Sequence, residues 1–404
     1  MNLHNKKYII RPLYLHKALS FRDKNLIKVF TGQRRTGKSY LMLQVMDKIR
    51  EIEPETQIVF IDKERMVFDF IKTADNLSEY LSEKVDPIKK TSLFIDEVQE
   101  IAQFERVLRS LLNEGNIDIW CTGSNAEILT GELADRLSGR YVEIRVHSLN
   151  YQEFLEFHNL PDNNNSLQLF LKFGGLPNLK NMPLEDDIVF DYLSSINATV
   201  LLKDIIKRHQ IRNVVMLENL IRFVADNTGS LFSAGSISKF LKSQGQKISS
   251  SIISTYISYM LDAYYLIKVP RSDIQGKRMF EINEKYYFED LGLRNSWTGY
   301  QPMHINKLIE NVVFKHLVVE GFNVSVGKMG EKEIDFIARK KALKIYIQCA
   351  YLMPNEKTRE REFGNLLKIK DNHRKMVVSM DEPSGGNVEG VEHIHLRDFL
   401  KLSL

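Results

Sequence analysis

The stretch "FTGQRRTGKSYL", residues 30–41, follows the pattern G-x-x-x-x-G-K-[ST] at every fixed position. A glycine-rich turn of this kind lets successive backbone N–H groups point at a phosphate, and the helix that follows adds the positive end of its dipole. The lysine of the pattern reaches the outer phosphate oxygens, and the hydroxyl group holds Mg²⁺. The stretch therefore predicts a cradle for the phosphates of a nucleotide.

The sequence on both sides of this loop agrees with that prediction. "LIKVFT" (26–31) is an apolar, β-branched run typical of a strand, and "YLMLQVMDKI" (40–49) has apolar residues at helical spacing. A solvated basic loop is the alternative, and the flanking strand and helix count against it. We predict that the loop binds ATP. The residues expected to contact it are Gly32, Gln33, Arg34, Arg35, Thr36, Gly37, Lys38, Ser39 and Tyr40.

A second motif supplies the acids that nucleotide hydrolysis requires. "TSLFIDEVQE" (91–100) is a continuous apolar run, typical of a parallel strand buried on both faces, and it ends in Asp96 and Glu97. Ligands bind at the carboxyl ends of strands in open α/β sheets. We predict that Asp96 and Ser39 hold Mg²⁺, and that Glu97 polarises the attacking water beside Lys38. Glu97 and Lys38 are thus the candidate catalytic residues, and a surface acidic pair is the alternative.

Polar side chains also end a third strand-like run, "IDIWCTGSN" (117–125). Ser124 and Asn125, with Thr122 before them, lie where contacts to the γ-phosphate are expected, although an ordinary strand-to-loop turn explains them equally. Arg136 and Arg140 flank a short turn in "LADRLSGRYVEIRV" (133–146). An arginine directed at the nucleotide of a neighbouring subunit stabilises transition-state charge. From the residues alone, surface arginines at a helix end are the better explanation.

The composition excludes several classes of protein. The chain has 404 residues, enough for several domains, with 43% hydrophobic and 27% charged residues, as in soluble globular proteins. Two cysteines form no disulfide framework, so we expect a cytoplasmic protein. We expect no membrane segment, because no apolar run is long enough. The net charge of +4 permits DNA binding without arguing for it.

Strands and helices alternate from about residue 26 to 146, which predicts a parallel sheet, and the pattern turns helical afterwards. From about residue 213 three helical stretches precede a predicted hairpin, an arrangement typical of a winged helix. We predict four domains, which are an ATPase core (1–148), a helical lid (149–214), a winged helix (215–298) and a C-terminal α/β domain (299–404).

The third helix of the predicted winged helix bears on the choice of partner. In a DNA-reading winged helix, exposed residues near its start enter the major groove, and here these are Ser249, Ser250 and Thr255. The stretch 249–265 has no lysine or arginine of its own. Packing or protein contact therefore explains this helix equally, and both DNA and a protein remain candidate partners.

Residues 27–146 resemble an AAA+ ATPase module, because the phosphate loop, the acidic strand, the polar strand end and an R-x-x-x-R turn come in the AAA+ order. The whole chain resembles a bacterial and archaeal family with an N-terminal AAA+ domain, a winged helix and a C-terminal domain related to PD-(D/E)XK nucleases. Other matching stretches are "RPLYL" (11–15), "DEVQ" (96–99), "GELADRLSGRY" (131–141), "FGGLP" (173–177) and "EIDFIARK" (333–340). The resemblance implies an α/β protein with a parallel-sheet P-loop AAA+ domain, a helical lid, a winged helix and a restriction-endonuclease-like α/β domain.

The nuclease resemblance concerns residues 306–353. A nuclease of this type needs acidic ligands for Mg²⁺ and a lysine that positions water. Glu310 and Asp335 match two acids, whereas Gln348 and Ala350 stand where the resemblance places a further acid and the lysine. We therefore expect the nuclease fold with a degenerate metal site, and doubtful cleavage activity.

The sequence thus predicts a Mg²⁺-dependent ATPase that moves a winged helix and a nuclease-like domain, with DNA as a candidate substrate. The alternative is a slow nucleotide-gated switch that binds a protein or DNA without cleavage or translocation. Action of Arg136 or Arg140 on a neighbouring nucleotide requires a homo-oligomer, which the sequence leaves open.

Overall fold

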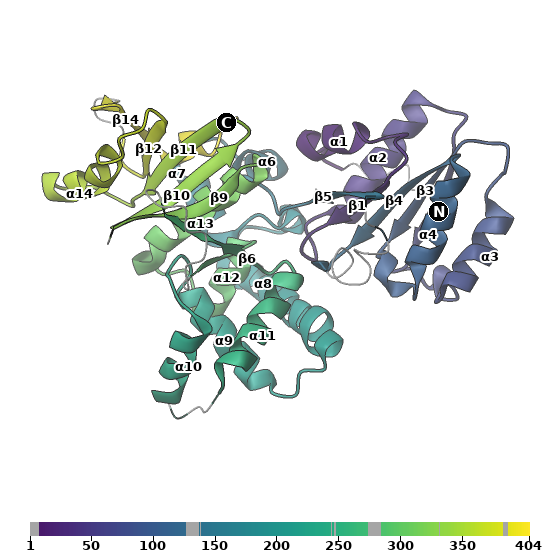
Figure 1. Ribbon diagram of the computed structural model, residues 1–404, viewed down its shortest axis with the longest axis horizontal. Coiled ribbons are helices and arrows are strands. Elements are labelled where there is room, and N and C mark those ends of the chain that lie inside the picture. The colour runs from purple at the N-terminus through teal and green to yellow at the C-terminus, as the bar shows by residue number, and fades with distance from the viewer. Residues whose placement is uncertain are drawn as a thin grey trace. The chain divides into compact units, whose positions relative to one another are not determined.

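The computed structural model describes residues 8–126, 137, 139–243, 245, 248–273, 284–330, 332–382 and 387–404. The chain divides into two compact units (Figure 1). The first comprises residues 1–147 with 262–264, and the second comprises 148–261 with 265–404. None of the described helices is both long and apolar enough to cross a bilayer.

A five-stranded sheet forms the centre of the first unit. Its order is β2-β3-β4-β1-β5, and every neighbouring pair is parallel. The carboxyl ends of all five strands therefore lie along one edge. This confirms the parallel sheet that the sequence predicts. The strands are β1 (Ile27–Thr31), β2 (Gln57–Asp62), β3 (Thr91–Asp96), β4 (Ile117–Gly123) and β5 (Tyr141–Arg145).

Helices cover both faces of this sheet, and the three central strands β1, β3 and β4 are buried on two sides. Helices α1 (Pro12–Leu19) and α2 (Lys38–Ile52) pack on the face that carries Phe30. Helices α3 (Ala74–Lys84) and α4 (Phe104–Glu114) pack on the opposite face (Figure 1). This explains the continuous apolar runs, because alternate residues of a strand fill two separate cores.

One charged pair lies inside this sheet. Lys28 of β1 is fully buried, and its ammonium group forms an ion pair with Asp118 of β4. Asp118 also accepts a hydrogen bond from Trp120 Nε1 at 2.8 Å. A charge this deep is tolerated only with a partner, so the pair fixes β1 beside β4.

A seven-stranded sheet and a set of helices form the second unit. The sheet order is β13-β14-β12-β11-β10-β9-β7, while β6 and β8 form a separate antiparallel pair. Its strands are β6 (Leu266–Val269), β7 (Arg271–Asp273), β8 (Lys285–Phe288), β9 (Asn323–Met329), β10 (Lys332–Lys340), β11 (Leu343–Cys349), β12 (Arg374–Ser379), β13 (Asn387–Val388) and β14 (Val391–His395). Its α-helices are α6 (Tyr151–His158), α7 (Asn164–Phe173), α8 (Asp186–Thr199), α9 (Val214–Asp226), α10 (Ala234–Ser243), α11 (Ser250–Asp262), α12 (Leu291–Thr298), α13 (Ile305–Val319), α14 (Glu356–Leu367) and α15 (Leu396–Phe399).

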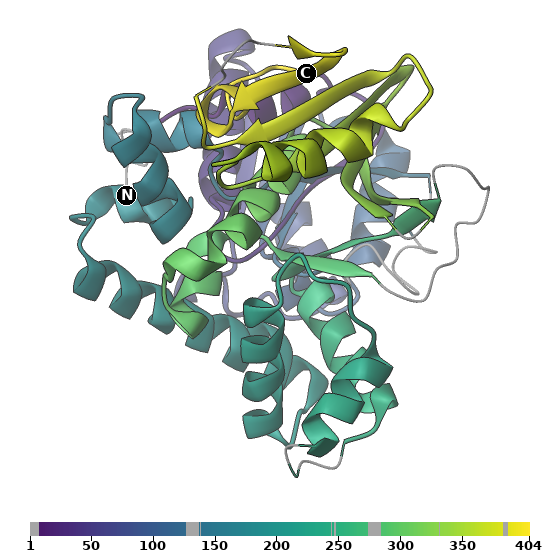
Figure 2. The ribbon, with the colours of Figure 1, turned by 90° about the vertical axis from the view of Figure 1, so that its left-hand side faces the viewer.

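Two helices cover opposite faces of the large sheet (Figures 1 and 2). Helix α13 packs on the face that carries Phe336 and Ile347, and α14 packs on the face that carries Ile337 and Tyr346. Strand β7, which the sequence places in the wing of a winged helix, pairs with β9, with Ser272 opposite Gly327. Segments 215–298 and 299–404 therefore share one sheet, and the domain boundaries predicted inside this unit stay predictions.

A buried histidine makes the second unit sensitive to acid. His316 of α13 is 5% exposed, its ring packs edge-on against Phe399, and its Nε2 lies 3.1 Å from the carbonyl oxygen of Leu402. Burial lowers the pKa of His316 to about 4. Between that value and the ordinary histidine pKa of about 6.5, the unfolded chain binds a proton that the folded chain does not. Stability at neutral pH is therefore lost as the pH falls.

We predict that the titration of His316 lowers the free energy of unfolding by about 1.5 kcal/mol between pH 6.5 and pH 5, since the unfolded histidine is already half protonated at pH 6.5. Urea denaturation at both pH values measures this loss, and His316→Gln should reduce it because glutamine does not titrate. The matched control is His373→Gln, at an exposed histidine of the same unit. An equal loss in wild type and His316→Gln would contradict the prediction.

Candidate functional site

The loop between β1 and α2 has a backbone that requires glycine. Gly32 has a φ of 134°, and a Cβ atom there would lie 2.2 Å from the carbonyl oxygen of Val146. Gly37 has a φ of 93° and forms the N-cap of α2. Both angles lie in the region that favours glycine, so the two fixed glycines of the motif have a conformational cause.

Lys38 folds back over the loop that precedes it. Its ammonium group donates to the carbonyl oxygens of Gly32 at 2.9 Å and Gln33 at 3.0 Å. The Thr36 hydroxyl also donates to Gln33 O, at 2.9 Å. The lysine is 4% exposed, so its charge lies within the loop and not in solvent.

Two features of the loop fit the phosphates of a nucleotide. Gly37 provides no side-chain cap, and the first turn of α2 has no acidic residue, so the positive end of this helix is available to an anion. The Gln33 side chain is fully buried, and neither of its polar atoms has a hydrogen-bond partner.

Asp96 lies beside Ser39, as the sequence predicts for a pair of Mg²⁺ ligands. The Ser39 hydroxyl forms a hydrogen bond with Asp96, and Thr122 Oγ1 donates another to Asp96 Oδ1. Burial raises the pKa of Asp96 to about 6, although both hydrogen bonds act in the opposite direction. Carboxylate and hydroxyl oxygens are the ligands that Mg²⁺ prefers, so this pair is suited to the ion.

Glu97 is held in a strained backbone position next to Asp96. Its φ is 53°, which is uncommon for a residue with a side chain, and its N–H donates to Thr122 Oγ1 at 2.8 Å. Its carboxylate accepts hydrogen bonds from Ser124 Oγ at 3.0 Å and from Gln99 Nε2. Burial alone would raise the pKa of Glu97, but Lys38, Arg34 and these hydrogen bonds outweigh it and lower the pKa. Glu97 is therefore ionised at neutral pH.

The other predicted contact residues differ in exposure. Ser124 and Asn125 are fully buried at the end of β4, whereas Tyr40 and Arg35 are exposed. Arg34 lies 3.7 Å from Glu64 in an ion pair. The structure therefore brings the fixed motif residues together with Ser124, whereas Tyr40 and Arg35 remain exposed.

Of the two arginines predicted to act on a neighbouring nucleotide, the structure describes only Arg140. Arg136 lies outside the described residues. Arg140 is exposed, and its carbonyl oxygen accepts the N–H of Ile27 at 2.8 Å. Ile27 is at the amino end of β1, whereas the phosphate loop follows the carboxyl end of that strand. Arg140 thus lies at the opposite edge of the sheet from the loop of its own chain.

In the second unit, Glu310 and Asp335 lie near one another, as the nuclease resemblance implies. Burial raises the pKa of Asp335, and the Glu310 carboxylate acts in the same direction. A lysine that the sequence did not single out, Lys285 of β8, forms ion pairs with both acids. Among the described residues no group of three or more His, Cys, Asp or Glu side chains is placed to hold a metal ion.

Sequence reasoning also missed Arg11, which supports the phosphate loop. Its guanidinium donates to the carbonyl oxygens of Thr36 at 3.1 Å and His147 at 3.0 Å, and it lies 4.4 Å from the centre of the Tyr14 ring. Its backbone N–H donates to Gln44 of α2 at 3.1 Å. Gln99 was missed as well. The only sequence signal for either was membership of the family-typical stretches "RPLYL" and "DEVQ".

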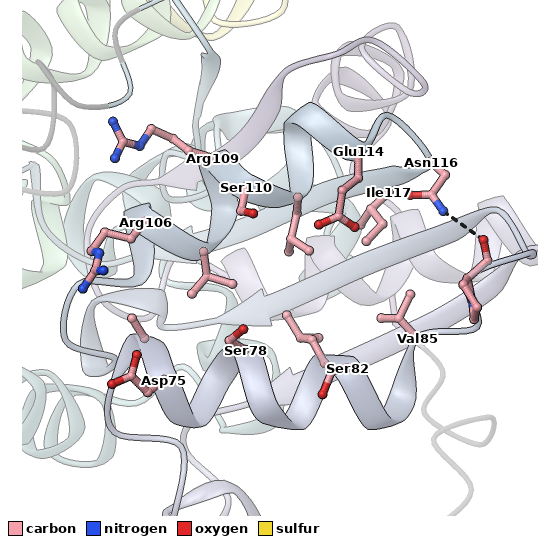
Figure 3. Close-up of a pocket in the computed structure, with 15 residues that line it drawn as sticks. Asp75, Ser78, Ser82, Val85, Arg106, Arg109, Ser110, Glu114, Asn116 and Ile117 are labelled. Carbon is pink, nitrogen blue, oxygen red and sulfur yellow. Dashed lines mark hydrogen bonds between the residues drawn. The ribbon is translucent and has the colours of Figure 1, made fainter.

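A groove of about 720 Å³ runs between α3 and α4 (Figure 3). Arg106 and Arg109 lie at one end, Glu114 lies toward the other, and serine side chains line the space between them. None of the residues predicted to contact ATP lines this groove. It lies on the face of the sheet opposite α2.

Comparisons with known proteins agree with this geometry. Residues 24–155 match a sequence family described as "AAA domain", and residues 164–304 match one described as a domain of unknown function. An uncharacterized protein of Haemophilus influenzae is 35% identical over 405 residues, which cover 98% of this chain and 99% of that protein. An uncharacterized protein of Methanocaldococcus jannaschii is 28% identical over 406 residues, covering 94% and 88%.

Solved structures are more remote. Cdc6p from Pyrobaculum aerophilum is 14% identical with a TM-score of 0.30, and the match covers 74% of this chain and 96% of that one. The Aeropyrum pernix Orc1 protein, solved in complex with DNA, is 11% identical with a TM-score of 0.31, covering 73% and 94%. Likenesses this weak carry no conclusion about function.

The phosphate loop, the parallel sheet and the sequence match together define the first unit as a P-loop AAA+ domain, which confirms the predicted resemblance of residues 27–146. The whole chain belongs to the same family as the Haemophilus influenzae protein.

We predict that Arg11→Met weakens ATP binding about tenfold without any direct contact between Arg11 and the nucleotide. The charged hydrogen bonds to Thr36 O and His147 O, worth about 1.5–3 kcal/mol each, would be lost, and the loop would lose its fixed shape. Equilibrium binding of a fluorescent ATP analogue measures the change. Arg22→Met, at a surface ion pair with Glu53, is the control. Equal affinity in both variants would contradict a supporting role for Arg11.

Proposed function

We propose that this protein is a Mg²⁺-dependent ATPase whose nucleotide cycle moves parts of its second unit. The observation that carries the proposal is the meeting of Lys38, Ser39, Asp96 and Glu97 at the carboxyl edge of one parallel sheet. A buried lysine, a hydroxyl–carboxylate pair and an ionised glutamate are the groups that phosphoryl transfer to water requires.

The chain's own groups have distinct roles in this proposal. Lys38 exchanges its contacts with Gly32 O and Gln33 O for phosphate oxygens of ATP. The ionised Glu97 orients a water molecule and accepts its proton as the γ-phosphate is attacked. Ser39 and Asp96 would hold Mg²⁺, which neutralises charge on the phosphate oxygens when bound.

The contacts of Glu97 support slow turnover as the second candidate. Gln99 and Ser124 occupy one oxygen of its carboxylate, and its backbone is strained. A glutamate restrained in this way can orient the attacking water only after the nucleotide or a partner changes its contacts. The alternative proposal is therefore a nucleotide-gated switch that binds a protein or DNA.

The second unit supports a winged helix and a nuclease-like domain without deciding the partner. Helices α9, α10 and α11 precede the β6–β8 pair, and α13 precedes the β9–β10 hairpin and β11, which is the order that the resemblance implies. Ser249, Ser250 and Thr255 are exposed. Both DNA and a protein therefore remain proposed partners. A homo-oligomer is proposed as well, because Arg140 lies away from its own phosphate loop.

We predict that Lys38→Ala abolishes ATP binding, because the loop loses the charge that faces the phosphates. Glu97→Gln should still bind ATP but hydrolyse it about 100-fold more slowly or worse, since an amide cannot accept the proton. Phosphate release with and without double-stranded DNA, together with equilibrium ATP binding, measures both effects.

The control is Lys48→Ala, at a solvent-exposed lysine of α2. DNA-stimulated hydrolysis would favour DNA as the substrate, whereas ATP binding with almost no turnover would favour the switch. Unchanged ATP binding in Lys38→Ala would contradict the proposed site.

A further inference from the structure

Four charged side chains meet in the second unit, and three of them are acids. Lys285 Nζ lies 2.7 Å from Glu333 Oε1, 3.3 Å from Glu310 Oε2 and 3.8 Å from Asp335 Oδ1. The lysine comes from β8, Glu310 from α13, and the other two acids from β10. The Lys285 side chain is 2% exposed, so its charge is neutralised almost entirely by these carboxylates.

Internal donors also occupy further positions around the same acids. Glu310 Oε2 accepts a hydrogen bond from the Tyr287 hydroxyl at 3.1 Å, and Asp335 Oδ2 accepts one from the backbone N–H of Cys349 at 2.8 Å. The backbone at Gly229 approaches so closely that a Cβ atom there would lie 2.8 Å from Glu310 Oε2. These contacts leave little space for an ion and its water ligands.

Strand β11 does not supply the ligands that the nuclease resemblance expects. Ile345 and Ile347 face the core beneath α13, and Tyr346 faces the core beneath α14. Because side chains alternate along a strand, Gln348 lies on the α14 face, with Ala350 two residues further along. The residue of β11 that faces the α13 side is Cys349, which packs against that core. The side of β11 toward Glu310 thus offers neither a carboxylate nor a lysine.

A divalent ion does not fit this arrangement. Mg²⁺ requires about six oxygen ligands at roughly 2.0–2.1 Å. Here an ammonium group lies among the carboxylates, and the described residues contain no group of three or more possible ligands placed around a metal position.

We propose that Lys285 is a built-in cation that takes the place of the metal ion in this acidic cluster. It joins β8 to α13 and β10 and closes the nuclease-like site to divalent ions. Asn311 of α13 supports the same junction, because its side chain bonds both the N–H and the carbonyl of Phe288 at 2.9 Å. The C-terminal domain then acts as a metal-independent part of the second unit that does not cleave DNA. The proposal does not rest on ATP hydrolysis.

The first experiment tests whether the cluster binds metal. Wild type and Asp335→Asn are titrated with Mn²⁺ without nucleotide, and the bound ion is counted by electron paramagnetic resonance. Both proteins bind the same amount of Mn²⁺ at the phosphate loop. The difference between their binding curves therefore reports Mn²⁺ at the acidic cluster alone. We expect identical curves and no Mn²⁺-dependent nicking of plasmid DNA by wild type. A Mn²⁺ ion that binds wild type and is lost in Asp335→Asn would overturn the proposal.

The second experiment tests Lys285 as a counter-ion. Lys285→Met leaves carboxylates without their cation, so we expect its melting temperature to fall by about 5–10 °C. Adding Glu310→Gln to this variant should restore part of the loss, because one repelling charge is removed. The control is Lys344→Met, at a partly exposed ion pair with Asp371. No loss in Lys285→Met, or no recovery in the double variant, would contradict the role. If Lys285→Met does not fold, the wild-type titration still decides.

Discussion

The position of β4 between β1 and β3 is the constraint on which the candidate ATP site depends. Parallel pairing on both sides places Thr122 of β4 where its hydroxyl reaches Asp96 and also the backbone N–H of Glu97. The same edge of the sheet carries the phosphate loop. A shift of β4 by one residue would turn its side chains to the other face and would break these contacts.

Buried charge is handled in the same way in both units. Lys28 is neutralised by Asp118 within one sheet, and Lys285 is neutralised by three acids from two elements. In each case close carboxylates offset the desolvation cost of the ammonium, so the partners fix the elements that carry them. The ammonium of Lys38 donates to two backbone carbonyls and also acts on the Glu97 carboxylate, whose pKa it lowers. A phosphate of ATP can replace the two carbonyls as its partner.

The phosphate loop is suited to turnover, whereas the cluster around Lys285 is suited to stability. At the phosphate loop, Gln33 has buried polar atoms without partners, and Glu97 is strained, so ligand binding can improve the local interactions. Around Lys285 the acids already have cationic, hydroxyl and backbone partners. The phosphate loop can therefore change its contacts when a nucleotide binds, whereas the Lys285 cluster keeps β8, α13 and β10 in a fixed arrangement.

The sequence by itself determined the features that depend on a few consecutive residues. Gly32, Gly37, Lys38 and Ser39 specify a loop geometry directly, and the apolar run before Asp96 specifies a strand buried on both faces. Only the tertiary structure decided the partners that come from distant segments. Arg11 supports Thr36, Gln99 restrains Glu97, and Lys285 lies among acids of α13 and β10. The face of the sheet on which Gln348 lies depends on which core its neighbours fill, and the resemblance that placed Gln348 at the position of an acid did not contain this information. The sequence around a residue predicts its backbone conformation. The partner of a charged side chain depends instead on how elements from separate parts of the chain pack together.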